Sequence, residues 1–365
     1  MVRKGFDRIL FFCTGLLLIL GTLVLFSISA TLSQETFGKT YFFLVHQILY
    51  GILPGIILGF IAFRMKLSDF KRFSLPLFLA NLVFLFLVFM PKMGLLSGGA
   101  RRWLKLGPIS FQPSELLKIS LFVYLAAWLE KRWGEKRYEK SLQKSISFLT
   151  ILGPICLALV LQPDIGTLLL IMTVAFLIYF FAETRFFHII LAGLLAICIL
   201  LLMIIYEPYR MNRILVFLIP QLEPMGIGYQ VQQAQIAIGS GGLFGKGIGM
   251  SKQKFFLSSP IADSIFALLC EETGFLGALI LIVLFTTFLI RGFKIANMAK
   301  DKFSKLLAFG ICLEIILQAL LNIGSMTGTL PLTGVPLPFI SYGGTHIISE
   351  LIGVGILLNI SKSYV

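Results

Sequence analysis

Long apolar stretches recur from one end of the chain to the other, and each is long enough to cross the hydrocarbon core of a bilayer. They lie near residues 9–31, 41–64, 74–90, 114–130, 146–162, 165–182, 186–206, 264–290, 304–324 and 343–361. Because lipid offers the backbone no hydrogen-bond partners, such stretches must be helical. The sequence therefore predicts an all-α polytopic membrane protein with about ten transmembrane helices.

The composition agrees with this prediction and excludes other classes of protein. Of the 365 residues, 58% are hydrophobic and 13% are charged, and the mean hydropathy is +0.94. Soluble domains contain about 25% charged residues. A water-soluble globule and a disordered chain are therefore excluded. The five cysteines lie in apolar runs without a CxxC pair, which excludes a disulfide scaffold.

Basic residues predict the orientation of the chain. The formal net charge is +14, and with the N-terminus inside, 20 Lys and Arg fall on the cytoplasmic side and 10 on the outer side. This excess predicts cytoplasmic N- and C-termini. It explains the basic pI without a nucleic-acid partner. The same topology makes residues 1–365 one integral membrane domain, with a large extracytoplasmic loop at about 207–263 between spans seven and eight.

Ionisable residues inside spans are costly and are candidates for function. Glu115 and Lys118 are three residues apart on one helix face, so they can pair with each other or line a substrate cavity. Ser114 before them is typical of a helix N-cap. Glu271 and Glu272 point about 100° apart on a helix, so both cannot face lipid.

Two further polar patterns lie in the last two spans. Glu314, Gln318 and Asn322 are spaced four residues apart, and this stripe predicts hydrogen bonds between helices. His346 and Glu350 share a face, which favours a hydrogen-bonded pair because two ligands are too few to indicate a metal.

Two carboxylates and a glycine-rich stretch lie at predicted outer turns. Asp164 and Asp263 each precede a span, where a helix cap or a site residue is expected. The stretch at 239–249 fails as a phosphate loop because Gly247, not Ser or Thr, follows Lys246. Its backbone could still approach an anionic head group.

Four blocks of sequence carry a resemblance to one family. They are GARRWLKLGPISFQPSELLK at 99–118, QPDIGT at 162–167, the region 228–274 that ends in EETG, and PLPFISYGG at 336–344. On these blocks the chain is identified as a member of the SEDS family (shape, elongation, division and sporulation), the membrane peptidoglycan polymerases that include FtsW and RodA. The resemblance implies a ten-helix bundle.

The resemblance also implies an activity and a catalytic residue. Family members polymerise lipid II, an undecaprenyl-pyrophosphate-linked disaccharide pentapeptide, into β-1,4 glycan strands with inversion outside the membrane. The family's catalytic carboxylate corresponds to Asp263, as a general base. The surrounding segment, LSSPIADS at 257–264, departs from the family pattern: the usual Glu before the Asp is missing, and Ser264 replaces a common Phe.

The remaining site residues are also implied by the resemblance. Arginine suits a pyrophosphate because its planar fork donates two charge-assisted hydrogen bonds. The candidate substrate-binding residues are Arg101, Arg102, Glu115, Lys118, Asp164, Arg210, Arg213, Ser341 and Tyr342. No cofactor is required by these residues, and the use of a divalent cation, Mg²⁺ or Mn²⁺, stays open.

The branch of the family and the partners follow from the same resemblance. The segment GIGMSKQK at 247–254 resembles FtsW and its sporulation relatives, which favours septal synthesis in cell division. A RodA-like elongation polymerase, a lipid II flippase and an inactive scaffold are the alternatives. The implied partners are lipid II, a class B penicillin-binding protein, other division or elongation proteins and membrane lipids. The penicillin-binding protein's helix is expected on spans eight and nine.

Overall fold

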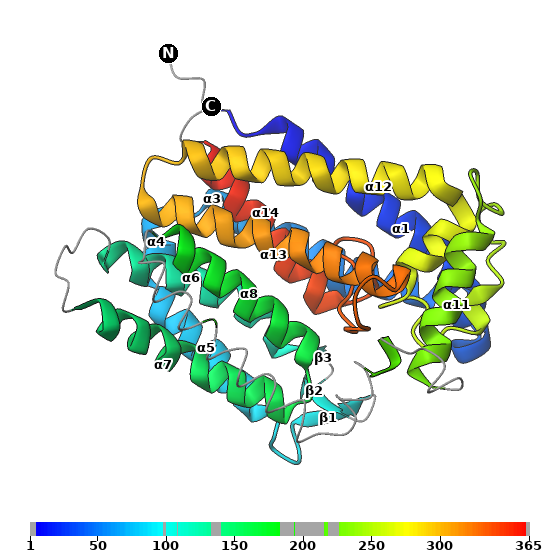
Figure 1. Cartoon of the computed structure of the whole chain (residues 1–365), viewed down its shortest axis with the longest axis horizontal. Helices are drawn as coiled ribbons and strands as arrows, with labels where there is room; N and C mark the ends of the chain where they lie inside the picture. Colours follow the sequence, from blue (N-terminus) through cyan, green and yellow to red (C-terminus); the bar gives the residue numbers. More distant parts are fainter. Residues whose placement is uncertain are drawn as a thin grey trace.

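The computed structural model describes residues 5–97, 100–107, 109–132, 140–182, 193, 215–217 and 226–362. Long helices run side by side in one bundle, and both ends of the chain lie at the same end of it (Figure 1). The predicted span at 186–206, and Arg210 and Arg213, lie outside the described residues.

The helices follow the predicted spans closely. They are α1 (Arg8–Phe37), α2 (Phe42–Gln47), the π-helical turn η1 (Ile48–Ile52), α3 (Leu53–Arg64), α4 (Leu67–Arg72), α5 (Ser74–Leu87), α6 (Pro113–Arg132), α7 (Lys140–Leu161), α8 (Ile165–Phe181), α11 (Ile227–Ser240), the 3₁₀ turn η3 (Gln253–Phe255), α12 (Ile265–Met298), α13 (Lys302–Thr327) and α14 (Gly344–Ser361). Among the described residues, five segments are long and apolar enough to cross a membrane, with α2, η1 and α3 forming one of them. The prediction of a helical membrane protein is confirmed, whereas the count of ten spans and the large loop stay predictions.

Residues 94–111 differ from the all-α prediction. Three antiparallel strands form a small sheet there in the order β1 (Gly94–Ser97), β2 (Ala100–Leu106) and β3 (Ile109–Phe111). In β2, Leu104 is fully buried while Lys105 is exposed, which is the two-residue alternation of a strand with one covered face. The all-α prediction is wrong for this segment, because its alternating pattern is too short to stand out among long apolar runs.

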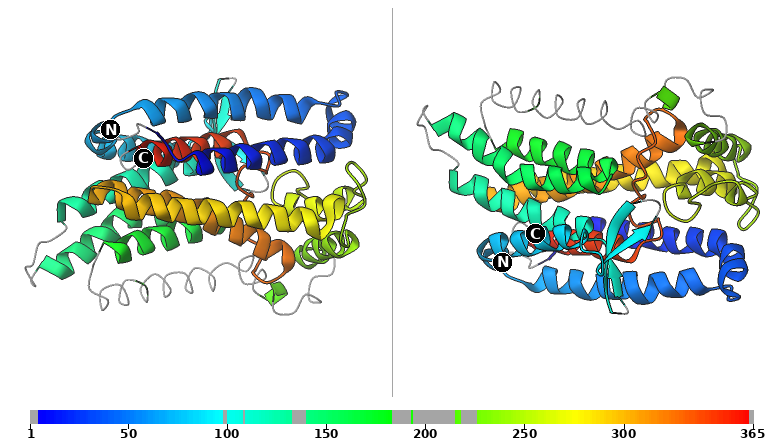
Figure 2. Two further views of the ribbon diagram at one scale, coloured as in Figure 1. Left: turned by 90° about the horizontal axis from the view of Figure 1, so that it is seen from above. Right: turned by 90° about the horizontal axis from the view of Figure 1, so that it is seen from below.

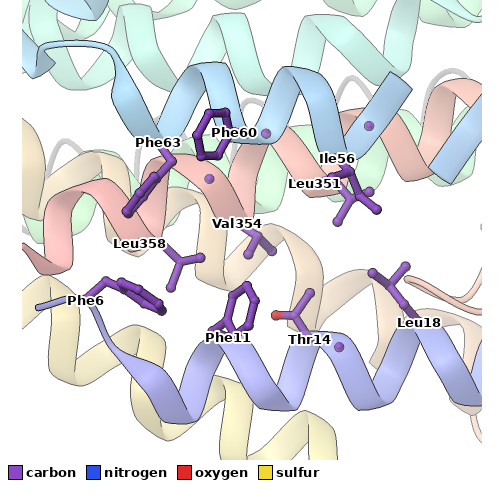
Figure 3. A pocket seen from close by; sticks show the side chains of 14 residues that line it. Phe6, Phe11, Thr14, Leu18, Ile56, Phe60, Phe63, Leu351, Val354 and Leu358 are labelled. Carbon is purple, nitrogen blue, oxygen red and sulfur yellow. The ribbon is translucent and has the colours of Figure 1, made fainter. Parts of the chain in front are cut away.

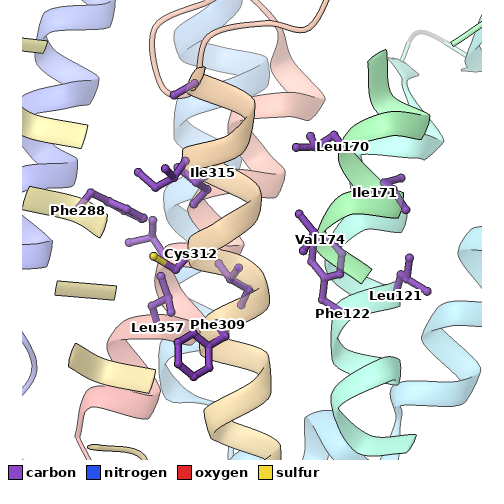
Figure 4. Close-up of a cluster of buried hydrophobic side chains, with 14 of the residues drawn as sticks. Leu121, Phe122, Leu170, Ile171, Val174, Phe288, Phe309, Cys312, Ile315 and Leu357 are labelled. Carbon is purple, nitrogen blue, oxygen red and sulfur yellow. The ribbon is translucent and has the colours of Figure 1, made fainter. Parts of the chain in front are cut away.

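Helix α13 forms the centre of the bundle. It packs against α12 and α14 and, on the other side, against α6 and α8 (Figure 2). Figure 4 shows Phe309, Cys312 and Ile315 of α13 facing Phe288 of α12 and Leu357 of α14. In the most apolar window of each helix, 72% of α13 is buried but only 22% of α12. A large part of α12 is therefore left open to lipid or to another protein.

Glycines bring α3 and α14 into close contact. A Cβ atom added to Gly59 would lie 2.6 Å from the carbonyl oxygen of Leu351, and one added to Gly355 would clash with the carbonyl oxygen of Gly59. Small residues let membrane helices approach until their backbones touch, and the gain is van der Waals packing. Gly15 of α1 is different, because a Cβ added there meets nothing within 4 Å.

These two environments predict opposite effects of the same substitution. Gly355→Ala should destabilise the protein by about 1–3 kcal/mol, because the added methyl forces α3 and α14 apart. Gly15→Ala, the matched control, should leave stability unchanged or raise it slightly. Thermal unfolding of the purified variants in detergent measures both, and equal melting temperatures would contradict the close contact.

Candidate functional site

Asp263 is a half-buried residue immediately before α12, and its main chain is held from two other elements. The Asn322 side chain of α13 donates to the carbonyl oxygen of Asp263 at 2.8 Å. The Ser341 hydroxyl donates to the Ala262 carbonyl oxygen at 2.7 Å, and the Tyr342 N–H donates to the Ile261 carbonyl oxygen at 2.8 Å. The main chain that carries the carboxylate is thus held at three consecutive residues whose carbonyl groups are bonded.

The segment 328–343, between α13 and α14, packs against Asp263 and against the start of α8. A Cβ added to Gly334 would lie 3.5 Å from Asp263 Oδ2, and Gly334 has a left-handed φ of +71°. On the other side, a Cβ added to Gly166 would lie 2.6 Å from the Thr333 carbonyl oxygen. Residues 333–335 therefore lie between Asp263 and the start of α8, which is preceded by Asp164.

Ser341 and Tyr342 act mainly as supports of this segment. Ser341 is fully buried, and its hydroxyl also accepts from the Leu337 N–H at 2.7 Å. The Tyr342 hydroxyl lies 2.8 Å from His46 Nδ1. Burial raises the pKa of Tyr342 to about 12, so this phenol stays neutral at physiological pH. Contact of either side chain with substrate stays a prediction.

Sequence reasoning missed the part that Gln47 plays at this position. The Gln47 side chain donates to the Ser341 carbonyl oxygen at 3.2 Å and accepts from the Gly343 N–H at 3.0 Å. It therefore holds both ends of the turn that leads into α14. The available signal was an amide inside the second apolar run, where polar side chains are rare.

Lys118 lies at the centre of a buried ionic cluster. Its ammonium is 2.9 Å from Glu115 Oε2 and 2.7 Å from Glu314 Oε1, and it donates to Gln318 Oε1 at 2.7 Å. The predicted pairing of Glu115 with Lys118 is confirmed, and both residues are almost fully buried, at 4% and 1% exposure. Ser114 is inside α6 rather than at its N-cap. That Glu115 and Lys118 contact substrate stays a prediction.

His346 and Glu350 of α14 extend this cluster. His346 Nδ1 is hydrogen-bonded to Glu115 Oε2 at 3.2 Å. Its Nε2 is 3.0 Å from Glu350 Oε1, within ion-pair distance but without hydrogen-bond geometry, so the predicted pair forms a close contact rather than a hydrogen bond. Glu350 Oε2 accepts from the Phe339 N–H at 2.8 Å. In the described part of the chain, no group of three or more His, Cys, Asp or Glu is arranged to hold a metal. The use of a divalent cation stays open.

The two arginines of β2 have different surroundings. Arg102 donates through Nε to the Gln162 carbonyl oxygen at 3.2 Å and through its guanidinium to the Pro163 carbonyl oxygen. Arg101 is exposed, and neighbouring residues of a strand point to opposite faces. Arg102 therefore fastens the sheet to the turn between α7 and α8, and Arg101 is the arginine of this pair that can reach a ligand.

Asp164 is buried at that same turn. It occupies the N-cap position of α8 but makes no side-chain cap bond, and its Oδ2 lies 3.4 Å from the Gln112 side-chain nitrogen. The break at 162–164 does separate α7 from α8, as predicted. Similarly, the N-cap position of α12 is Ser264 rather than Asp263.

The glycine-rich stretch contacts α12 through its backbone, while most of its residues are exposed, and its approach to an anionic head group stays a prediction. Gly274 breaks α12 with a φ of +68°, and the Lys246 N–H donates to the freed Glu271 carbonyl oxygen at 2.9 Å. The Glu271 carboxylate accepts from Lys246 Nζ at 2.8 Å and from the Gln253 N–H at 3.2 Å. Sequence reasoning missed these contacts, which satisfy the carboxylate and the carbonyl oxygen of Glu271 without any ligand.

The ionic cluster predicts a large loss of stability when its cation is removed. Lys118→Met should cost about 3–5 kcal/mol, because it leaves Glu115 and Glu314 buried without a counter-ion. Lys294→Met, which removes an exposed lysine from α12, is the control and should change little. Thermal unfolding in detergent measures the difference. Adding Glu115→Gln and Glu314→Gln to Lys118→Met should recover part of the loss, and no recovery would contradict this account.

Comparisons with known proteins agree with this arrangement. Residues 7–364 match the family described as cell cycle protein, FtsW/RodA/SpoVE. The chain is 36% identical to the probable peptidoglycan glycosyltransferase FtsW of Geobacter sp. strain M18, over 98% of this chain and 97% of the relative. It is also 36% identical to stage V sporulation protein E of Bacillus subtilis, over 98% and 97%.

A solved structure gives the same result for the fold. This chain matches a chain of a solved structure with a TM-score of 0.80 and 28% sequence identity, over 98% of both chains. That structure is described as "structural coordination of polymerization and crosslinking by a peptidoglycan synthase complex". With the family match over nearly the whole length, the chain belongs to the FtsW/RodA/SpoVE family of membrane proteins.

Proposed function

We propose that this chain is a peptidoglycan glycosyltransferase that joins lipid II units into β-1,4 glycan strands at the outer face of the cytoplasmic membrane. Membership of the family and relatives named peptidoglycan glycosyltransferase support the activity. The excess of basic residues in the predicted inner loops supports an inward position of both termini. The Asp263 end of the bundle, opposite the termini, then faces outward.

In this proposal Asp263 is the general base. The 4-hydroxyl of the acceptor sugar transfers its proton to the carboxylate while its oxygen bonds to the donor's anomeric carbon. The bond from that carbon to the pyrophosphate oxygen breaks on the opposite side, so undecaprenyl pyrophosphate leaves and the configuration inverts. The observation that supports this most directly is the fixed main chain at 261–263, because a base must be held within reach of its proton.

The leaving pyrophosphate needs positive charge. Arg101 is exposed on β2, whereas Arg102 is bonded to two carbonyl groups at the turn between α7 and α8. We assign Arg101 to the pyrophosphate, where its fork stabilises the charge that develops as the bond breaks. Arg102 instead positions the sheet.

The division branch of the family fits better than the elongation branch. Relatives named FtsW and stage V sporulation protein E are 36% identical to this chain, whereas the matched Thermus thermophilus RodA structure is 27% identical. The segment at 247–254 supports the same choice. Septal synthesis is therefore the proposed role.

A class B penicillin-binding protein is the proposed partner. The matched chain from a peptidoglycan synthase complex supports a partner that cross-links the product. Spans eight and nine were the expected surface, but α13 is mostly buried. Exposed apolar side chains lie along α12, including Leu276, Ile280 and Val283. The partner's helix is therefore assigned to α12.

The first test is the removal of the proposed base. Asp263→Asn should lower lipid II polymerisation by about 10²–10⁴-fold, because the amide cannot accept the proton. The assay follows glycan strands by gel electrophoresis, with the purified protein alone and with its cognate class B protein. Asp69→Asn, in α4 near the other end of the bundle, is the control and should keep full activity.

Two outcomes would contradict this proposal. Polymer from a folded Asp263→Asn variant would remove Asp263 from the mechanism. No polymer from the wild-type protein with its partner, together with lipid II scrambling in liposomes, would favour the flippase alternative.

The two arginines of β2 provide a second test. Arg101→Gln should lower kcat and kcat/KM for lipid II by about tenfold, because one charge-assisted contact to the developing charge of the pyrophosphate is lost, while the melting temperature stays unchanged. Arg102→Gln should lower the melting temperature, because two carbonyl groups lose their donor. Steady-state kinetics and thermal unfolding separate the two effects. The reverse pattern would exchange the assigned roles.

A further inference from the structure

An apolar groove of about 520 Å³ lies between α1, α3 and α14, at the end of the bundle that holds the chain termini. Figure 3 shows Phe11 and Leu18 of α1 facing Phe60 of α3 and Val354 of α14 across it. The groove has a volume typical of ligand pockets, which span about 300–1,000 Å³. It is separate from the segment that holds Asp263: its lining on α14 begins at Leu351, which lies seven residues, or roughly 10 Å, beyond the start of α14 at Gly344.

The side chains that line the groove favour a hydrocarbon as its ligand. Thr14 has the one side-chain polar group among the lining residues, and its hydroxyl already donates to the Leu10 carbonyl oxygen at 2.9 Å. A polar ligand would lose its hydrogen bonds here without replacement. An apolar chain loses nothing and gains contact with aromatic and aliphatic side chains.

The length of the groove matches an acyl chain. From Phe6 to Leu18 the lining extends roughly 18 Å along α1, close to the thickness of one leaflet's hydrocarbon, about 15 Å. One acyl chain of a leaflet therefore fits the length of the groove.

Two cations lie at the end of the groove nearest the termini. The Lys362 ammonium is 3.4 Å from the ring centroid of Phe63 and donates to the Phe63 carbonyl oxygen. The Arg64 guanidinium is 5.2 Å from the ring centroid of Phe60, and both rings line the groove. The pKa of Lys362 is lowered by burial and by the charge of Arg64. An anion between the two would relieve this repulsion.

Asp7, the acidic residue next to the lining residue Phe6, does not supply that anion. Asp7 follows Phe6 directly, but its carboxylate caps α1 at the Leu10 N–H and accepts from Arg291 Nε at 2.9 Å. Its charge is therefore matched by Arg291, on the side of α12. The charge at the mouth of the groove is left positive, which matches a lipid phosphate.

We infer that this groove binds an anionic phospholipid of the leaflet on the side of the chain termini, with one acyl chain in the groove and its phosphate on Arg64 and Lys362. The basic-residue excess predicts that this is the cytoplasmic leaflet. The site is then structural or regulatory, because the proposed chemistry takes place at the opposite face. The inference does not depend on the proposed activity.

The test is photo-crosslinking of the full chain in nanodiscs. The probes are phosphatidylglycerol and phosphatidylcholine, each with a diazirine in an acyl chain. Phosphatidylglycerol is expected to label peptides that contain residues 6–18 and 351–358, and to do so more than phosphatidylcholine. Each basic residue near a membrane surface is worth about fivefold, so Arg64→Gln with Lys362→Gln should lower the labelling about 25-fold.

Matched variants separate this site from ordinary lipid contact. Lys66→Gln removes an exposed lysine at the same end and should leave the labelling unchanged. Gly15→Leu fills the groove from α1, where a Cβ meets nothing within 4 Å, and should abolish labelling by both probes. Leu18→Trp does the same from the next turn if Gly15→Leu fails to fold.

Three results would overturn the inference. One is equal labelling by the two lipids in the wild-type protein. Another is undiminished labelling of a folded groove-filled variant. The third is displacement of the probe by unlabelled lipid II as readily as by unlabelled phosphatidylglycerol, which would assign the groove to the substrate.

Discussion

The structure depends on the ammonium of Lys118, which is almost fully buried between the helices of the bundle. Burying one charge costs several kcal/mol unless it is paired and fully hydrogen-bonded. Here Glu115 lies on the same helix, while Glu314 and Gln318 come from α13. The ammonium is satisfied only when α6 and α13 have the right rotation and depth. The cluster therefore fixes the register of two helices whose apolar faces would otherwise fit in several ways.

The same cluster fixes the position of Asp263, although the two do not touch. Gln318 donates to the Pro336 carbonyl oxygen at 3.1 Å, and Glu350 accepts from the Phe339 N–H at 2.8 Å. Both bonds hold the segment 328–343, which in turn holds the main chain at 261–263. One turn of α13 further on, Asn322 bonds Asp263 directly. The proposed base is thus positioned by a polar network that begins at a buried lysine.

The sequence predicts the spans and several of the polar contacts, but not the contacts that depend on packing between distant segments. Long apolar runs locate the spans, and helical spacing predicts both the pair Glu115–Lys118 and the stripe that ends at Asn322. It cannot predict that Glu314 joins Lys118, because the two residues are far apart in the chain and only packing brings them together. Arg102 was grouped with Arg101, since residue type alone does not reveal which face of a short strand is covered.

The two ends of the bundle differ in how their backbone is packed. Toward the termini, α3 and α14 touch through glycines, and the open space beside them is apolar. At the other end, α12 is broken at Gly274 and the segment 328–343 is not helical. Non-helical backbone at membrane depth is tolerated only where protein or a water-filled cavity satisfies it. Asn322 and Ser341 each bond both the segment 328–343 and the main chain at 262–263, so the non-helical segment and the proposed base are held by the same polar groups.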